Sequence, residues 1–152
     1  MSFEPRDPDY AAKTRASHYA QHLMRHLGMD LLRVAPGEVD VSMPWDQRIC
    51  ESGGGLHGGT VTAGMDTACA SAAGSLLAKG DTLLTAELKT NFLRHAVGDT
   101  FRFEGRVIKP GRTLIFTEGK CWAITDDQEK LVATMTATMA VLPGGGWDAG
   151  QG

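Results

Sequence analysis

The feature that most constrains the fold is a glycine-rich loop that leads directly into a smooth apolar helix, within residues 53–79. Apolar residues recur at helical spacing after the loop, and the segment contains no proline. Half of residues 60–79 are Ala, Gly or Ser. A helix with so little polar surface is normally buried on most sides, with other backbone packed close against it. The sequence therefore predicts a central helix over residues 58–78 that the rest of the chain encloses.

Asp66 is the only formally charged side chain between Gly58 and Ala78. A carboxylate on such a helix is expected to be buried, which is costly unless the group is paired, hydrogen-bonded or used in chemistry. Asp66 is therefore the first candidate for a functional residue. The alternative is a structural role, either in a local hydrogen bond or in an ion pair at an interface.

The composition describes an ordinary globular protein: 152 residues, 42% hydrophobic and 22% charged, which predicts a single domain. A net charge of -3 argues against generic nucleic-acid binding. Three cysteines without C-x-x-C spacing suit reduced thiols. The first residues are polar, and the apolar runs are too short to span a membrane. We therefore expect a cytoplasmic protein with no membrane and no nucleic acid as partner.

Residues 10–27 are predicted to form an N-terminal helix that ends at Gly28, after a loose leader over residues 1–9. His18, His22 and His26 fall on one face of this predicted helix. Because no carboxylate or cysteine lies nearby to complete a metal site, we expect a solvated or interface face and no metal.

The remaining pattern is that of strands separated by turns. In the first of the four strands after the helix, Ala86, Leu88 and Phe92 are expected to share a face with Thr90. Those four strands, joined by short turns, predict an antiparallel meander. A sheet curled around the central helix is the economical packing, an α+β architecture. The tail, residues 143–152, is expected to be disordered. The predicted strands are 31–34, 38–43, 85–93, 101–108, 113–124 and 131–141.

Four motifs then point to a family: His57-Gly58-Gly59 at the start of the helix, Asp66 nine residues after the histidine, and two motifs downstream. Asn91-Phe92-Leu93-Arg94 lies in the next strand, and Lys109-Pro110-Gly111-Arg112-Thr113 lies at a turn. Together they resemble the hotdog-fold acyl-CoA thioesterases, in particular the PaaI-like branch of the phenylacetate pathway. The resemblance covers residues 38–142 and implies a single hotdog domain over residues 1–142.

The resemblance implies hydrolysis of an acyl-CoA to free acid and CoA, with CoA as part of the substrate, no other cofactor and no metal. It also implies a homodimer with a continuous sheet, often paired into a dimer of dimers. By position, Asp66 is the nucleophile or general base, the Gly58 N–H polarises the thioester carbonyl, and His57 holds that loop. Thr85 places a hydroxyl near the attacking water. The expected substrate-binding residues are Gly59, Asn91, Arg94, Lys109, Gly111 and Arg112, of which the three basic side chains are candidates for contacts with the CoA phosphates.

The N-terminus of a buried helix offers free N–H groups and a positive dipole end, so Gly58 and Gly59 fit an oxyanion hole. The alternative is that these glycines only permit a turn or tight packing. Eight residues separate Gly58 from Asp66, about 12 Å along a helix at ~1.5 Å per residue. One carbonyl cannot readily meet both groups. The spacing therefore predicts a site shared between subunits, with the carboxylate from one chain and the N–H from the other.

Two positions depart from the family pattern: Glu51 replaces an amide, and His95 replaces a proline. An amide donates a hydrogen bond, whereas an ionised carboxylate cannot. If Glu51 lies near the Asp66 of a second chain, repulsion raises one pKa, and a protonated Glu51 donates as the amide does. The alternative is that the flexible loop over residues 53–55 turns Glu51 into solvent.

Other functions are less well supported by the sequence. A serine hydrolase is disfavoured because no G-x-S-x-G motif occurs. Cys69 lies mid-helix among alanines and suits a small core residue better than a nucleophile. The competing function is a non-catalytic acyl-CoA or small-ligand binding protein on the same fold, which the Glu51 departure keeps open. A hotdog dehydratase is a third reading.

Overall fold

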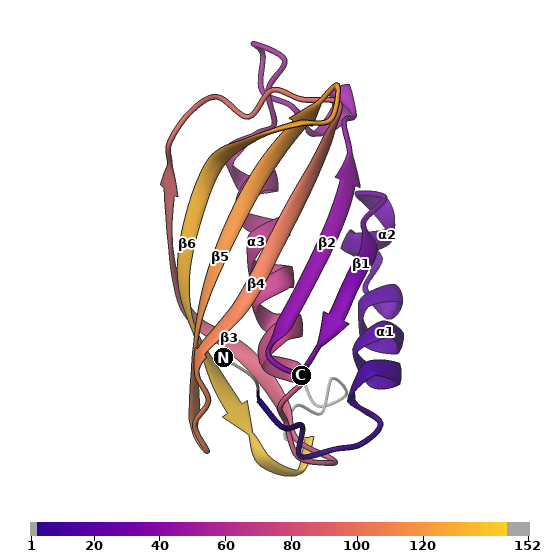
Figure 1. Ribbon diagram of the computed structural model, residues 1–152, viewed down its shortest axis with the longest axis vertical. Helices are drawn as coiled ribbons and strands as arrows, with labels where there is room; N and C mark the ends of the chain where they lie inside the picture. The colour runs from indigo at the N-terminus through magenta and orange to yellow at the C-terminus, as the bar shows by residue number, and fades with distance from the viewer. Residues whose placement is uncertain (1–2, 146–152) are drawn as a thin grey trace, which may run out of the picture.

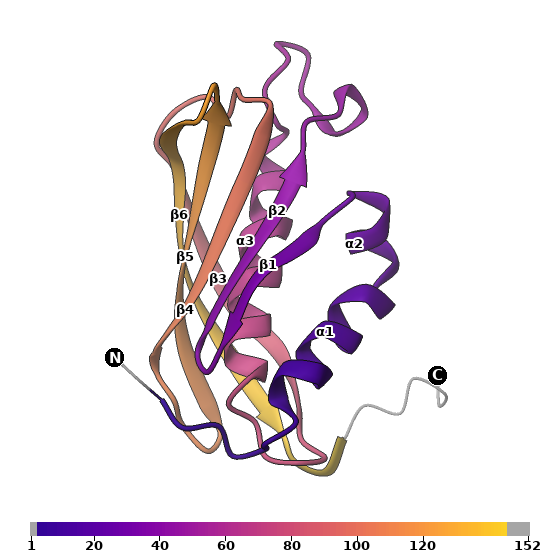
Figure 2. The ribbon, with the colours of Figure 1, turned by 45° about the vertical axis from the view of Figure 1, so that its right-hand side comes forward.

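A computed structural model describes residues 3–145, in which one six-stranded antiparallel sheet curls around a central helix (Figure 1). Two short helices lie beside this core on the helix side of the sheet (Figure 2). The predicted α+β hotdog architecture with an additional N-terminal helix is confirmed. The elements are α1 (Tyr10–Ala20), α2 (His22–His26), β1 (Asp30–Ala35), β2 (Glu38–Pro44), η1 (Gln47–Ile49), α3 (Gly58–Gly74), β3 (Thr82–Phe92), β4 (Thr100–Lys109), β5 (Leu114–Thr125), β6 (Gln128–Leu142) and η2 (Pro143–Gly145).

The small residues of α3 allow its backbone to lie directly against the sheet. A Cβ added at Gly105 of β4 would lie 2.1 Å from the Ala68 carbonyl oxygen. A Cβ added at Gly64 of α3 would lie 2.5 Å from the Phe103 ring. Small side chains at these crossings bring helix and sheet together, as the smooth sequence predicts. Among the helices of residues 3–145, none is long and apolar enough to cross a membrane.

The strand order is β1-β2-β4-β5-β6-β3, so the predicted four-strand meander is wrong at its first strand. β3 pairs with β6, and β4 pairs with β2. Residues 93–99 carry the chain across the end of the sheet between β3 and β4 (Figure 1). The β2–β4 pairing aligns buried side chains such as Met43 and Phe101 on the core face. Burial of these two apolar rows against α3 outweighs the local preference for pairing consecutive strands.

A β-bulge between Thr85 and Glu87 sets the faces of β3. Thr85 faces α3, and so does Thr90, whose hydroxyl lies 3.4 Å from that of Thr62. In a regular strand, two residues five apart would point to opposite faces. The expected apolar face at Ala86 and Leu88 is exposed, because β3 is an edge strand whose inner side is only partly covered.

The predicted N-terminal helix is interrupted at Gln21, whose φ of -72° and ψ of 122° are extended. The break separates α1 from α2 and lets Met24 of α2 reach the core. His18 is fully buried, with its Nε2 3.0 Å from the Met29 carbonyl oxygen, so the expectation of a solvated or interface face is wrong there. Because His18 lies in α1 and both His22 and His26 lie in α2, the three histidines do not share one helix face.

The two ends of the described chain are more ordered than expected. Phe3 of the predicted loose leader packs against the core, and Asp7 is buried. At the other end, η2 is a short turn in which the Gly144 N–H donates to Asp81, 3.1 Å away. Residues 143–145 of the tail that is predicted to be disordered thus form this turn, and the rest of the tail lies outside the described residues.

The central helix, α3, ends at Gly74, four residues before the predicted end at residue 78. The Ser75 hydroxyl donates to the Ala72 carbonyl at 2.6 Å and accepts from the Gly37 N–H at 2.7 Å. These two bonds satisfy the helix end and tie it to the β1–β2 turn. The chain from residue 75 to Asp81 is therefore available to pass from the helix to β3.

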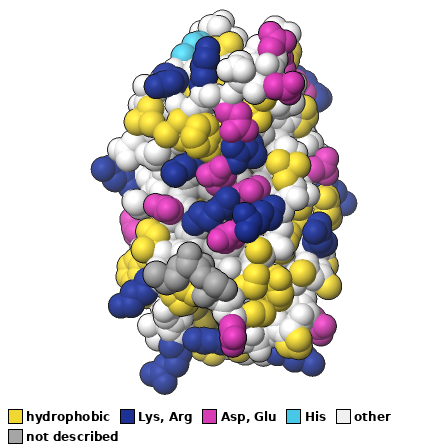
Figure 3. All heavy atoms as spheres, viewed as in Figure 1, with side chains coloured by type: hydrophobic (Ala, Val, Ile, Leu, Met, Phe, Trp, Pro, Cys, Tyr) yellow, Lys and Arg dark blue, Asp and Glu magenta, His cyan; other side chains and the backbone are white. Residues whose placement is uncertain are grey.

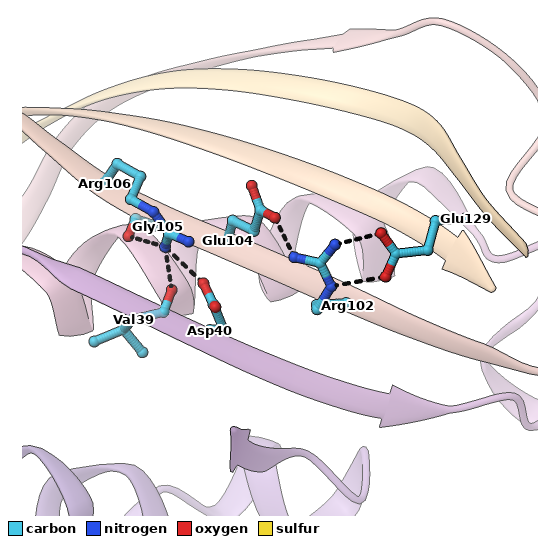
Figure 4. A network of polar contacts seen from close by, with 7 residues as sticks. All are labelled: Val39, Asp40, Arg102, Glu104, Gly105, Arg106 and Glu129. Atoms are coloured by element: carbon cyan, nitrogen blue, oxygen red, sulfur yellow. Dashed lines mark hydrogen bonds and ion pairs between the residues drawn. The ribbon is translucent and has the colours of Figure 1, made fainter. Parts of the chain in front are cut away.

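The face of the sheet that points away from α3 carries interleaved acidic and basic side chains (Figure 3). Arg106 contacts Asp40 at 2.6 Å and donates to the Val39 carbonyl at 3.2 Å (Figure 4). Arg102 pairs with Glu104 and with Glu129, the latter at 2.7 Å. Cross-strand pairing of opposite charges suits a solvated sheet face. The charged side chains named here on the outer face of the sheet are therefore paired with one another.

Candidate active site

Asp66 lies at the middle of α3, the helix that the sheet encloses, and its carboxylate accepts a hydrogen bond from β3. The Thr85 hydroxyl donates to Asp66 Oδ1 at 2.8 Å. Asp66 is half-buried rather than buried as predicted, and it lines a cavity of about 380 Å³ between α1, α3 and the start of β3. A carboxylate that is oriented by a hydroxyl and open to a cavity can reach a bound molecule. Thr85, which the family resemblance places near the attacking water, therefore contacts Asp66 within one chain.

The N-terminus of α3 presents one free backbone donor. His57 caps the helix: its Nδ1 accepts from the Gly59 N–H at 2.9 Å, and its carbonyl accepts from the Thr60 and Val61 N–H groups. The Gly58 N–H has no acceptor within residues 3–145. Gly59 is thus already engaged by His57, so its predicted share of the oxyanion hole is not available. Gly58 is the donor that the helix end leaves for a ligand.

Gly58 opens into a second cavity, of about 350 Å³, that Asp66 does not line. Phe92, Arg94 and His95 line this cavity with it, and a Cβ added at Gly58 would lie 3.2 Å from the Phe92 ring. Asp66 and Gly58, the two groups that the predicted mechanism brings together, thus face different cavities in a single chain. This arrangement agrees with their separation of eight residues along α3.

The other predicted substrate-binding residues fall into separate places. Asn91 is exposed on β3, opposite Thr134 of β6. Lys109, Gly111 and Arg112 belong to the hairpin between β4 and β5. That hairpin lies at the opposite end of the molecule from the N-terminus of α3 (Figures 1 and 2). One chain therefore gathers Arg94 near Gly58 but leaves the hairpin residues far from it.

Glu51 does not behave as the sequence suggested. Its carboxylate accepts from the Gly53 N–H at 2.7 Å and the Gly55 N–H at 3.0 Å, and lies 2.7 Å from His95 Nε2. The Gly53 N–H, then His95 and the Gly55 N–H, hold the pKa of Glu51 below its ordinary value of 4.5. An ionised Glu51 is therefore favoured, opposite to the protonated donor expected. Nor does the loop turn Glu51 away into solvent, since the carboxylate organises that loop.

This geometry predicts an acid-sensitive loop. Since the folded-state pKa of Glu51 is lowered, its contribution is complete above pH 4.5 and is lost as the pH falls through the lowered value. Amide-exchange protection factors of Gly53 and Gly55 should stay constant from neutral pH down to that range and then fall. Glu51→Ala should abolish them at every pH, whereas Ser52→Ala in the same loop should leave them unchanged. Protection that survives to pH 3 in the parent protein would show that other contacts hold the loop.

The structure pairs His95, the second position that departs from the family pattern, with Glu51. The two departures from the family pattern are 44 residues apart in the chain and meet beside the loop that precedes Gly58. A Cβ added at Gly55 would lie 2.4 Å from His95 Nε2, so the imidazole lies against the loop backbone. The sequence signal for this contact is that Glu51 and His95 both depart from the family pattern in the same chain.

Cys69 is excluded as a nucleophile by its surroundings. Its side chain is fully buried in the core, and burial raises the pKa of the thiol to about 12. A thiol in that state is not ionised near neutral pH. The interpretation of Cys69 as a small core residue is supported.

Comparisons with known proteins identify the family of the chain. The model of the thioesterase superfamily matches residues 53–130, from the glycine loop to the first residues of β6. A thioesterase family protein from Silicibacter pomeroyi is 41% identical, with a TM-score of 0.86 over 88% of this chain and 98% of that one.

Two more distant solved structures share the fold. The E. coli PaaI protein, from the phenylacetic acid degradation operon, is 23% identical, with a TM-score of 0.77 over 89% of this chain and 95% of that one. A Bacillus halodurans protein crystallised with CoA is 24% identical, with a TM-score of 0.73 over 88% of this chain and 84% of that one. The matched family segment is just over half of the 152 residues and contains both His57-Gly58-Gly59 and Asp66. The chain therefore belongs to the thioesterase superfamily and is a hydrolase of thioester bonds.

Proposed function

We propose that the protein hydrolyses acyl-CoA thioesters to the free acid and CoA, in a site that two copies of the chain build together. In each site, Asp66 of one copy activates the attack, and the Gly58 N–H of the other copy binds the carbonyl oxygen. The observation that carries the proposal is that Asp66 and Gly58 face separate cavities of one chain. CoA enters as part of the substrate, and the proposed chemistry requires no other cofactor.

The separation of Gly58 from Asp66 supports a site that two copies share. Eight residues along α3 correspond to about 12 Å at ~1.5 Å per residue. A thioester carbonyl must lie roughly 3 Å from its hydrogen-bond donor and also within reach of the attacking oxygen. One carbonyl does not readily meet both groups of a single chain, so in the proposed site a second copy supplies one of them.

The exposed edge of the sheet supports such a second copy. β3 pairs with β6 on one side, and no strand within residues 3–145 pairs with its other side. Leu84, Leu88 and Phe92 of β3 are exposed apolar side chains. Antiparallel pairing of two β3 strands would continue the sheet and cover these side chains. It would also reverse the direction of the second α3, which brings its N-terminus toward Asp66 of the first.

The proposed chemistry follows from the two groups. Asp66, oriented by Thr85, either attacks the thioester carbon or removes a proton from the attacking water. The carbonyl oxygen gains negative charge, which the Gly58 N–H and the N-terminal end of α3 stabilise. The C–S bond then breaks, and the CoA thiolate leaves and takes up a proton. Attack by Asp66 itself adds an anhydride intermediate that water hydrolyses.

The CoA nucleotide would extend toward the ends of the sheet. Arg94 lies beside Gly58, whereas the β4–β5 hairpin with Lys109, Gly111 and Arg112 lies at the other end of the chain. In the proposed reversed pair, the hairpin of one copy would approach the helix N-terminus of the other. Basic side chains from both copies would then meet the phosphates, with Asn91 on the shared edge.

Subunit complementation tests the shared site. Gly58→Pro removes the N–H, and proline is well tolerated at the first position of a helix. Asp66→Ala removes the carboxylate. Each variant alone should release almost no thiol from acyl-CoA esters, whereas a mixture refolded or exchanged together should recover activity, because heterodimers contain one intact site. Absence of recovery in a mixture whose subunit exchange is proven by mass spectrometry would contradict the shared site.

The same assay separates the enzyme from a binding protein. Thiol release across alkyl-, aryl- and arylacetyl-CoA esters is the expected result. Tight binding of several CoA esters in calorimetry, without thiol release from any, would instead support the non-catalytic acyl-CoA binding protein.

A further inference from the structure

The cavity beside the N-terminus of α3 contains a side chain that titrates near neutral pH. Of the described residues that line this cavity, only Arg94 and His95 carry an ionisable side chain. The guanidinium of Arg94 keeps its proton throughout the physiological range, whereas an imidazole ordinarily exchanges its proton near pH ~6.5. Among these residues, His95 is therefore the one that can give up a proton and recover it during a reaction.

Glu51 orients the His95 imidazole at the end of the sheet near the N-terminus of α3 (Figure 1). The Glu51 Oε1 atom lies 2.7 Å from His95 Nε2, and an ionised carboxylate can only accept, so Nε2 carries the hydrogen of this bond. The N–H groups of Gly53 and Gly55 hold the carboxylate in turn. The second ring nitrogen, Nδ1, has no hydrogen-bond partner among residues 3–145. One nitrogen of His95 is thus fixed by the protein, and the other is left for a ligand.

Charged groups from several segments surround His95. Glu51 is ionised near neutral pH, since the Gly53 N–H, His95 and the Gly55 N–H hold the pKa of Glu51 below its ordinary value of 4.5. Arg94, next to His95 in the chain, is a cation that lines the same cavity. His57 is engaged at Nδ1 by the Gly59 N–H and does not compete for Glu51. In the proposed shared site, Asp66 of the second copy adds a further carboxylate.

We propose that His95, oriented by Glu51, is the catalytic acid that protonates the leaving thiolate of the substrate. The inference rests on the proposed acyl-CoA hydrolysis and assigns the source of the proton that the thiolate takes up. When the carbonyl oxygen is bound at the Gly58 N–H, the sulfur on the same carbon enters the cavity that His95 lines. The C–S bond breaks, its electron pair stays on sulfur, and the Nδ1–H of the imidazolium protonates that sulfur. The side chain of His95 is 55% exposed, so the ring recovers its proton from solvent.

The proposed transfer is thermodynamically favourable. An imidazolium has an ordinary pKa of ~6.5 and a thiol such as that of cysteine one of ~8.5, so the proton moves from the ring to the sulfur. The step is the same whether Asp66 attacks the carbon or activates water. The proton that Asp66 takes from water is released to solvent on the opposite side of the reacting carbon. Two separate groups therefore handle the two protons of the hydrolysis.

Two thioesters of the same acyl group test the assignment. The CoA ester releases an alkanethiolate that needs a proton, whereas the 4-nitrothiophenyl ester releases a thiolate that is stable without one. His95→Gln keeps an N–H for Glu51 but has no proton to transfer. It should lower kcat for the CoA ester about thirtyfold, somewhat less than usual for general acid–base catalysis because a thiolate is a fair leaving group, and kcat for the aryl ester by less than about threefold. His26→Ala is the control, since His26 is an exposed histidine of α2 outside the cavity.

The pH dependence separates a proton donor from a side chain that only supports the loop. In the parent protein, kcat for the CoA ester should fall at alkaline pH as the imidazolium is lost, and this fall should be absent from His95→Gln. Glu51→Gln should move the fall to lower pH, because it removes the negative charge in contact with the ring. Free imidazole should restore part of the activity of His95→Ala. The amide-exchange protection of Gly53 and Gly55 should stay at the parental level in His95→Gln, since its amide can still donate to Glu51.

Three results would overturn the inference and leave hydrolysis by Asp66 and Gly58 intact. They are a parental kcat for the CoA ester in His95→Gln, an equal loss of kcat for the CoA and aryl esters, and an alkaline fall that persists in His95→Gln. Absence of thiol release from every ester by the parent protein would instead refute the proposed function, and with it the basis of the inference.

Discussion

Replacing Asp66 by Asn is expected to lower kcat for acyl-CoA hydrolysis by about a hundredfold or more, the usual loss when a general base or nucleophile is removed. The amide has nearly the same shape and can still accept the hydrogen bond from Thr85 that the carboxylate accepts at 2.8 Å. The fold should therefore persist, with a melting temperature close to that of the parent protein. Thiol-release kinetics and a thermal melt of the same sample provide the two measurements.

The control for this variant lies in the same cavity. Asp81 also lines it, and its carboxylate accepts from the Gly144 N–H. Asp81→Asn should change kcat by less than about threefold, because no chemistry depends on its charge. An Asp66→Asn protein with parental kcat would refute the proposed mechanism, whatever its substrate.

Replacing Gly105 by Ala is expected to give the largest loss of stability among small substitutions in this chain. The added methyl group would lie 2.1 Å from the Ala68 carbonyl oxygen and 2.6 Å from the Cys69 backbone nitrogen. Since backbone atoms cannot rotate away, α3 would have to move off the sheet. We expect unfolding to become easier by about 3 kcal/mol, the upper part of the range for overpacked cores. Tm should fall by roughly 10 °C in a domain of this size.

Gly74→Ala is the matched control, because a Cβ there meets only Leu83 at 4.0 Å. It should leave Tm unchanged or raise it slightly, since alanine restricts the unfolded chain more than glycine does. Chemical denaturation of the two variants side by side isolates the effect of helix-to-sheet contact. If Gly105→Ala matches the parent in its denaturation midpoint, the close packing of α3 on β4 is not a determinant of stability.

Much of the fold follows from local patterns. The small, uncharged residues after Gly58 predict a helix in contact with other backbone, and the structure places Gly105 of β4 directly on Ala68. The alternation in β2, with Val39 and Val41 fully buried, likewise predicts a half-buried strand. Such patterns suffice because hydrogen bonding within a helix, and the two-residue period of a strand, depend on neighbours in the chain.

The sequence also predicts part of the candidate site, because that part depends on the spacing of residues within one helix. A lone carboxylate on an uncharged helix is visible in the sequence, and Asp66 does open into a cavity. The spacing between Gly58 and Asp66 is likewise a property of one helix, so it predicts their separation without knowledge of the sheet. Family resemblance, rather than any local pattern, suggested Thr85.

Other features depend on tertiary contacts between residues distant in sequence. The bulge in β3 turns Thr85 toward Asp66, and the extended backbone at Gln21 divides the N-terminal helix. Glu51 meets His95 only because the chain crosses the end of the sheet between β3 and β4. In each case the local sequence permits several conformations of similar free energy, and burial of apolar surface elsewhere in the fold selects one of them.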